Sequence, residues 1–211
     1  MTAPDTDVLP PPGAVEVFGP ALGSAEAFAQ ILATRGVEQG LIGPHEVPRL
    51  WDRHLLNCAV VAELIGDRCE TLVDIGSGAG LPGIVLAMVR PEIDVTLLDP
   101  MERRCRFLSE CVAELGLANA SVLRGRAEDV VLRADVATAR AVAPLDQLAE
   151  LAIGVVRPGG MVLAIKGRSA ADELNKARPV LRRIGARSAE VVRAGQGKVV
   201  PATTVVRFFA S

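Results

Sequence analysis

The chain has 211 residues, half of them apolar, and a formal net charge of −2, which suits one α/β domain with a sizeable core and a modest appendage. Its apolar runs are shorter than the roughly 20 residues that span a bilayer, and its start lacks the pattern of a signal peptide, so we expect a cytoplasmic protein with no membrane contact. Four cysteines without CxxC spacing and only two histidines argue against a metal site and indicate reduced, buried thiols.

The first third of the chain predicts a lead-in followed by helices. Five prolines within residues 1–23 and little periodicity predict a mobile segment that need not pack. Ser24 is a candidate cap for a helix over 25–38. Apolar residues at helical spacing predict a second helix over 46–66, and the apolar face of that helix includes His54. A packing role for His54 is the simpler interpretation, and a substrate contact is the alternative.

From residue 71 onward, short β-branched runs alternate with amphipathic stretches, which is typical of a parallel sheet with helices on both faces. We expect strands over 71–75, 94–98, 120–124, 134–138 and 160–166, and helices over 82–89, 101–116, 144–156 and 170–184. Two last runs, 186–194 and 202–210, have no room for a helix between them, so they should pair as an antiparallel hairpin. The prediction is a Rossmann-like, seven-stranded, mostly parallel α/β domain over 69–211 with an N-terminal helical cap over 24–68.

The segment LVDIGSGAGLPG, residues 72–83, joins the first of these strands to a helix through a glycine-dense turn. Gly76, Gly78 and Gly80 let the backbone turn sharply and approach a ligand closely. Ligands of open α/β sheets bind beyond the carboxyl ends of the strands, where this turn lies. The segment also contains the G-x-G-x-x-G spacing of dinucleotide sites, so the turn alone leaves the ligand open.

Three neighbouring features favour S-adenosylmethionine over NAD. Asp74 stands two residues before Gly76, where it can pair with the cationic amino group of the cofactor but would repel a pyrophosphate. Asp99 ends the next strand and can accept hydrogen bonds from ribose hydroxyls, although NAD enzymes use the same device. After the third strand, the Ala127 backbone and the Glu128 carboxylate could meet the adenine.

Further runs stand at matching distances: LLDPMERRCRFLSECVAELGL, NASVLRGRAED, ATARAVAPL and LAIKG follow the glycine segment, and RHLLNC precedes it. Together they resemble the bacterial 16S rRNA methyltransferase G family, also called glucose-inhibited division protein B, over about residues 24–208. The resemblance implies the class I methyltransferase fold and methylation of N7 of a guanine, position 527 in the 530 loop of 16S rRNA. It also implies cofactor contacts at Gly76, Leu81, Ala127, Glu128 and Arg140.

Guanine N7 carries a lone pair and no proton, so transfer to it needs no general base, and we predict no proton-abstracting catalytic residue. Catalysis would come mainly from positioning. No N/D-P-P-Y tetrad follows the fourth strand and no Pro-Cys motif is present, which counts against exocyclic amines and cytosine C5 as targets. Arg140 could hold the methionine carboxylate or a phosphate; the alternative is an ion pair with Asp135 or Glu128.

Charge is distributed unevenly along the chain. Residues 157–211 hold 11 Lys+Arg against 3 Asp+Glu, whereas the preceding 156 residues hold 12 against 22. A basic surface of this kind can contact RNA phosphates, and a solvated surface is the alternative. The candidates are Arg53, Lys166 and Arg168, with Arg178, Arg182 and Arg183 nearby. One Trp, five Phe and no Tyr argue against a base-stacking platform, so we expect a monomer that recognises structured rRNA or the small ribosomal subunit.

Three other functions remain open from the residues themselves. An NAD-dependent oxidoreductase is favoured by the glycine spacing but disfavoured by Asp74 and by the C-terminal hairpin. A small-molecule methyltransferase would share the cofactor site and lack RNA affinity. A non-catalytic binding module is disfavoured by the presence together of Gly76, Asp99 and Glu128.

Overall fold

In a computed structural model, which describes residues 8–211, seven strands form one sheet in the order β3-β2-β1-β4-β5-β7-β6. The strands are β1 (Thr71–Ile75), β2 (Asp94–Asp99), β3 (Ala120–Arg124), β4 (Ala134–Arg140), β5 (Val156–Lys166), β6 (Arg187–Ala194) and β7 (Thr203–Phe209). Strands β1 to β5 pair in parallel, and β7 runs antiparallel to both of its neighbours. The strand order reverses between the neighbouring strands β1 and β4, and in such sheets ligands bind at that point.

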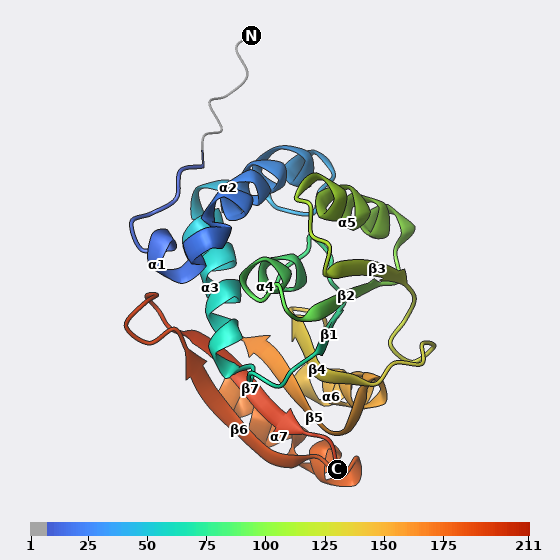
Figure 1. Cartoon of the computed structure of the whole chain (residues 1–211). Helices are drawn as coiled ribbons and strands as arrows, with labels where there is room; N and C mark the ends of the chain where they lie inside the picture. The colour runs from blue at the N-terminus through green and yellow to red at the C-terminus, as the bar shows by residue number, and fades with distance from the viewer. Residues whose placement is uncertain (1–7) are drawn as a thin grey trace.

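Helices cover both faces of the sheet, as Figure 1 shows. They are α4 (Gly83–Val89), α5 (Glu102–Glu114), α6 (Leu145–Val155) and α7 (Ala170–Arg183). Leu72 and Leu97 pack toward α4 and α5 together with the N-terminal helices, whereas Val73 and Ala137 face α6 and α7. Successive side chains of a strand point to opposite faces, so a strand buried on both sides must be apolar throughout. The predicted doubly covered sheet is confirmed.

The chain before the sheet forms a series of short helical segments. They are α1 (Ala14–Phe18), η1 (Gly19–Ala21), α2 (Leu22–Ile31), η2 (Leu32–Gly36), η3 (Pro44–Arg49), η4 (Leu50–Leu55), α3 (Leu56–Ala59) and η5 (Val60–Leu64). The last four follow one another over the stretch predicted as a single helix, with the predicted apolar face buried. Pro48 lies in the first of them and cannot donate a backbone hydrogen bond, and that segment is a 3₁₀ rather than an α-helix.

The predicted mobile lead-in over 1–23 is wrong for its described part, while residues 1–7 lie outside the described residues. Ala14 and Phe18 are buried, and the Phe18 ring meets the Trp51 ring edge-on with centroids 5.8 Å apart. The Trp51 indole N–H donates to the Val8 carbonyl at 2.9 Å. The prediction relied on the many prolines and overlooked that Ala14 and Phe18, which are four residues apart, share one face of a short helix.

Ser24 does not cap a helix as predicted. The helix α2 begins at Leu22 and has Ala21 at its N-cap, so Ser24 lies inside it. The 3₁₀ turn η1 leads directly into α2, and the Leu22 N–H donates to the Gly19 carbonyl of that turn. Backbone carbonyls of η1 can therefore accept from the first N–H groups of α2, and no side-chain cap is needed.

The predicted C-terminal hairpin is confirmed, and its loop returns to the N-terminal helices (Figure 1). The Gly195 N–H donates to the Glu63 carboxylate at 2.9 Å, and the Lys198 Nζ lies 2.8 Å from the same carboxylate. The Thr203 hydroxyl donates to the Asn57 carbonyl at 3.0 Å. The cap and the sheet therefore share one core without a boundary in packing. Within residues 8–211 no helix has the length and apolarity needed to cross a membrane.

Candidate cofactor site

The glycine-rich turn lies at the carboxyl edge of the sheet, between β1 and α4. Gly76 adopts a φ of 66°, and a Cβ on it would lie 2.8 Å from the Val142 side chain, which follows β4. Both the backbone conformation and the close approach therefore require glycine at this position. The Gly76 and Ser77 N–H groups donate to the Leu98 carbonyl at 2.8 and 3.1 Å, which holds the turn against β2. Leu81, a predicted cofactor contact, is buried at the end of the turn.

Asp74 is fully buried at the end of β1 and holds the start of α4. Its Oδ2 accepts the Gly83 N–H at 2.9 Å, and a Cβ on Gly83 would lie 2.6 Å from the same oxygen. Its Oδ1 is buried and accepts no hydrogen bond from any described residue. Burial raises the pKa of Asp74 to about 7. A buried oxygen without a donor is costly, and the cationic amino group of the expected cofactor is a donor that would satisfy it.

Asp99 is fully buried at the end of β2, and both of its oxygens accept hydrogen bonds. Oδ2 accepts the Gly78 N–H at 3.0 Å and lies 3.5 Å from Arg104, and Oδ1 accepts the Met101 N–H at 2.9 Å. A carboxylate offers about four acceptor positions, so a ribose hydroxyl would share Asp99 with these donors. The structure thus gives Asp99 a second role that the sequence did not suggest, because it ties the glycine-rich turn to β2.

The two residues predicted to meet the adenine lie at the same edge, just after β3. The pairing of β2 with β3 sets Asp99 opposite Arg124, and Gly125 N–H donates to the Asp99 carbonyl at 3.2 Å. Ala127 is buried, whereas the Glu128 side chain is 49% exposed and free to turn toward a ligand, since its ion pair with Arg126 spans 3.5 Å. The carboxyl ends of β1, β2 and β3 therefore bring the predicted residues to one edge.

Arg140 ends β4 at this edge and is bound by the N-terminal helices. Strand β4 pairs with β1 so that Thr138 stands opposite Asp74, and Arg140 lies two residues further along, beside the turn. A guanidinium nitrogen of Arg140 lies 2.8 Å from His54 Nδ1, and His54 Nε2 lies 2.8 Å from Glu46 Oε2. The positive charge of Arg140 opposes the burial that raises the pKa of Asp74.

Neither acid that we considered as a partner of Arg140 fills that role. Asp135 pairs with Arg157, with nitrogen and oxygen 2.6 Å apart, and Glu128 pairs with Arg126. Sequence reasoning also missed Glu46, although its place two helical turns before His54 was a signal that the two side chains share a face.

The predicted RNA-binding residues do not form one exposed set. The Lys166 side chain is only 8% exposed; its Nζ lies 2.9 Å from Glu173 and donates to the Ala143 carbonyl at 2.8 Å. Lys166 therefore holds the segment after β4, and its burial and pairing disfavour the phosphate contact that we predicted for it. Arg168 is exposed and forms no ion pair with any described residue, and Arg53 is half-exposed and pairs with Glu46 at 3.0 Å.

On α7, the arginines that we expected near these residues are exposed: Arg178, Arg182 and Arg183. Arg183 pairs with Glu150 of α6. Of the basic residues that we expected to contact RNA, Arg53, Arg168 and the three arginines of α7 are therefore exposed.

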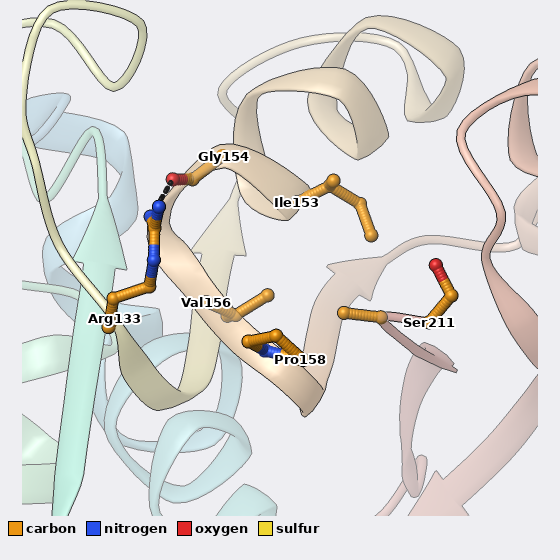
Figure 2. A pocket seen from close by; sticks show the side chains of 7 residues that line it. Arg133, Ile153, Gly154, Val156, Pro158 and Ser211 are labelled. Atoms are coloured by element: carbon orange, nitrogen blue, oxygen red, sulfur yellow. Dashed lines mark hydrogen bonds between the residues drawn. The ribbon is translucent and has the colours of Figure 1, made fainter.

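A shallow hollow of about 260 Å³ lies at the opposite edge of the sheet, where β4 and β5 begin (Figure 2). Arg133 donates to the Gly154 carbonyl across it, at 3.4 Å. Its other described lining residues carry no charged side chain: Ile153, Val156, Pro158, Ala210 and Ser211. The hollow is separate from the site built by the glycine-rich turn.

Known proteins resemble the chain over almost its whole length. A family model described as rRNA small subunit methyltransferase G matches residues 22–200. The ribosomal RNA small subunit methyltransferase G of Thermobifida fusca is 56% identical over 202 residues, covering 95% of this chain and 85% of that protein. Its counterpart in Streptomyces avermitilis is 52% identical over 200 residues, covering 93% and 84%.

Solved structures resemble the fold at low identity. A SAM dependent methyltransferase from Aquifex aeolicus has a TM-score of 0.55 at 23% identity, covering 74% of this chain and 90% of that one. A SAM-dependent O-methyltransferase from Thermotoga maritima has a TM-score of 0.55 at 15% identity, covering 72% and 64%. At these identities the likeness concerns the fold alone.

Proposed function

Because the chain belongs to the rRNA small subunit methyltransferase G family, we propose that it transfers a methyl group from S-adenosylmethionine to the RNA of the small ribosomal subunit. The observation that carries this function is 56% identity to a curated relative over 95% of the chain. The residues support it independently, because a buried, partly unpartnered carboxylate beside a glycine turn suits a cationic cofactor better than a pyrophosphate.

We further propose N7 of guanine 527, in the 530 loop of 16S rRNA, as the acceptor. This atom loses no proton when it is methylated, so the site needs no general base. Several titratable groups at this edge are already engaged: both oxygens of Asp99 accept backbone N–H groups, and both ring nitrogens of His54 have partners within the protein. The free oxygen of Asp74 and the Glu128 carboxylate are assigned to the cofactor in our proposal.

Bound S-adenosylmethionine would supply an electrophilic methyl group on its sulfonium. In our proposal Asp74 binds its amino group, Asp99 binds the ribose, and the Ala127 backbone and Glu128 bind the adenine. Because Gly76 has no side chain, the cofactor can approach the backbone of the turn there, where a Cβ would lie 2.8 Å from the Val142 side chain. Precise alignment of donor and acceptor can lower a barrier by up to about 7–11 kcal/mol, which is enough to make positioning the main source of catalysis.

Arg140 lies where it can bind the carboxylate of the cofactor or an RNA phosphate. Arginine suits both groups because its planar N–H donors match two oxygens at once. The RNA itself would contact Arg53, Arg168 and the exposed arginines of α7, with the enzyme acting as a cytoplasmic monomer.

The deciding experiment maps methylated guanines in 16S rRNA from cells with and without the gene, and repeats transfer with the purified enzyme. We expect a single N7-methylguanine to disappear with the gene, and labelled methyl transfer to 16S rRNA to stop when that guanine is replaced by adenine. Unchanged methylation in the deletion strain would refute the proposed target. Methyl transfer to a metabolite with no affinity for RNA would favour the small-molecule methyltransferase.

A further inference from the structure

Two hydrogen bonds connect a carboxylate of the N-terminal helices to the arginine at the cofactor site. They run from Glu46 on η3 through His54 on η4 to Arg140 at the end of β4, each 2.8 Å long. His54 and Arg140 are 86 residues apart in the chain, so only the tertiary structure brings them together. The His54 side chain is 11% exposed and the Glu46 side chain 31%, so the middle of the connection is largely out of water.

The chemistry of the three groups fixes the direction of both hydrogen bonds. A guanidinium only donates, so His54 Nδ1 must accept from Arg140. A neutral imidazole with an accepting Nδ1 carries its proton on Nε2, and that N–H donates to the Glu46 carboxylate. Burial and the neighbouring charges of Arg140 and Arg53 lower the pKa of His54 against the opposing effect of Glu46, which keeps the ring neutral at pH 7.

Because His54 lies between Glu46 and Arg140, Arg140 keeps the positive charge and the free N–H donors that a direct ion pair with a carboxylate would take up. A carboxylate bound bidentately to Arg140 would neutralise its charge and occupy two of its five N–H donors. The neutral His54 occupies one donor and leaves the full charge near Asp74. One guanidinium nitrogen of Arg140 is thereby fixed by His54, and the remaining N–H donors are available for an anionic group.

We propose that Glu46 and His54 are positioning residues, which hold the Arg140 guanidinium, fully charged and in a fixed orientation, for the anionic group that it binds during methyl transfer. The inference rests on the proposed function in its assignment of the cofactor site. It makes the N-terminal helices part of that site rather than a cover over it. The alternative is that His54 is only a packing residue.

The first test reads the hydrogen bonds directly by long-range nitrogen–proton NMR of the imidazole rings. The chain has two histidines, so His45 is an exposed internal control. At pH 7.5 we expect His54 as the Nε2–H tautomer, with a pKa below the ordinary histidine value, and we expect Arg140→Ala to raise the His54 pKa. An Nδ1–H tautomer of His54, or a His54 pKa that is unchanged in the Arg140→Ala variant, would overturn the proposal whether or not the protein methylates RNA.

The second test compares two amide replacements of His54. His54→Asn places a carbonyl oxygen near the position of Nδ1, where it can accept from Arg140, whereas His54→Gln places its amide near Nε2 and leaves Arg140 unbound. We expect His54→Gln to raise the dissociation constant of S-adenosylmethionine, or the KM for RNA, about tenfold. His54→Asn should leave the same constant close to that of the unchanged protein. Both variants should melt within a few degrees of each other.

A double-mutant cycle completes the comparison. If His54 acts through Arg140, His54→Gln should have little further effect on either constant in an Arg140→Ala background. Equal effects of the two amides, or additive effects of the His54 and Arg140 changes, would show that His54 only packs. Cofactor binding is measured by calorimetry, so the result for the dissociation constant of S-adenosylmethionine is independent of whether 16S rRNA is the acceptor.

Discussion

At the scale of single residues, the site depends on carboxylates whose surroundings differ although both are fully buried. Asp74 keeps one oxygen without a described donor, and its pKa is raised to about 7 by burial, whereas Asp99 accepts from two backbone N–H groups. Asp74 is therefore suited to receive a cation, and Asp99 is suited to hold the turn and share its remaining acceptor position.

Cofactor binding should release a proton from Asp74 at low pH. With a pKa of about 7, most Asp74 carboxyls are protonated at pH 6 before binding, and a cationic amino group selects the ionised form. We expect affinity to fall as the pH drops below 7, and calorimetry at pH 6 in buffers of different ionisation heat to show release of most of one proton. Asp74→Asn should abolish this release and the exposed Asp94→Asn should not; equal release from both would contradict the assignment.

Asp99→Ala should raise the dissociation constant of S-adenosylmethionine tenfold or more, equivalent to about 1.4 kcal/mol, through loss of the ribose contact. Asp94→Ala, at the exposed start of the same strand, is the matched control and should leave the constant unchanged. Isothermal calorimetry gives both values. A constant unaffected by Asp99→Ala would mean that the ribose binds elsewhere.

At the scale of elements, the segment after β4 is held from two sides, by His54 at Arg140 and by Lys166 at Ala143. Lys166 itself pairs with Glu173 on α7, so β5 and α7 together fix the segment that lies over Gly76. In our proposal the exposed arginines of α7 contact the RNA instead. A basic residue at the end of a strand therefore has a structural role here, although its charge suggested a phosphate contact.

Lys166→Met should lower the free energy of unfolding by about 1–3 kcal/mol, because it leaves the partly buried Glu173 without its partner. Arg183→Ala removes an exposed ion pair with Glu150 and should cost less than about 1 kcal/mol. Urea denaturation followed by circular dichroism measures both. The salt dependence of RNA binding should weaken for Arg168→Ala rather than for Lys166→Met; the opposite result would restore Lys166 as a phosphate contact.

At the scale of the whole molecule, segments near both ends of the described residues pack against the N-terminal helices. The segment around Phe18 packs on Trp51, and the loop between β6 and β7 binds the helix that carries Glu63. The N-terminal helices, α4, α5 and one face of the sheet form a single buried cluster. The helical cap is thus part of the domain, which is why it can position a residue at the cofactor site.

Phe18→Ala should destabilise the protein by about 3–5 kcal/mol, the usual cost of emptying a buried aromatic site. Val15→Ala, on the exposed side of the same short helix, should change stability by less than about 0.5 kcal/mol. Thermal melting distinguishes the two. Equal and small effects would show that this segment does not pack in solution.

Patterns that repeat along the chain predicted most of the fold, because strand alternation and helical spacing are local consequences of burial. All seven strands, the four helices on the sheet and the final hairpin were predicted from such patterns. The family was predicted from the resemblance of contiguous motifs to those of known proteins. The packed helix α1 near the start was not predicted, because its two buried residues, Ala14 and Phe18, are too few to show a helical period among the prolines.

The amino-acid order was sufficient to predict the glycine turn and the acids at the strand ends, because parallel strands bring their carboxyl ends to one edge whatever surrounds them. Which charges meet was decided only by the folded chain. Lys166 turned inward to Glu173, and Arg140 bound His54 rather than an acid. Such pairings join residues far apart in the chain, and their geometry depends on how whole layers pack, which no local pattern encodes.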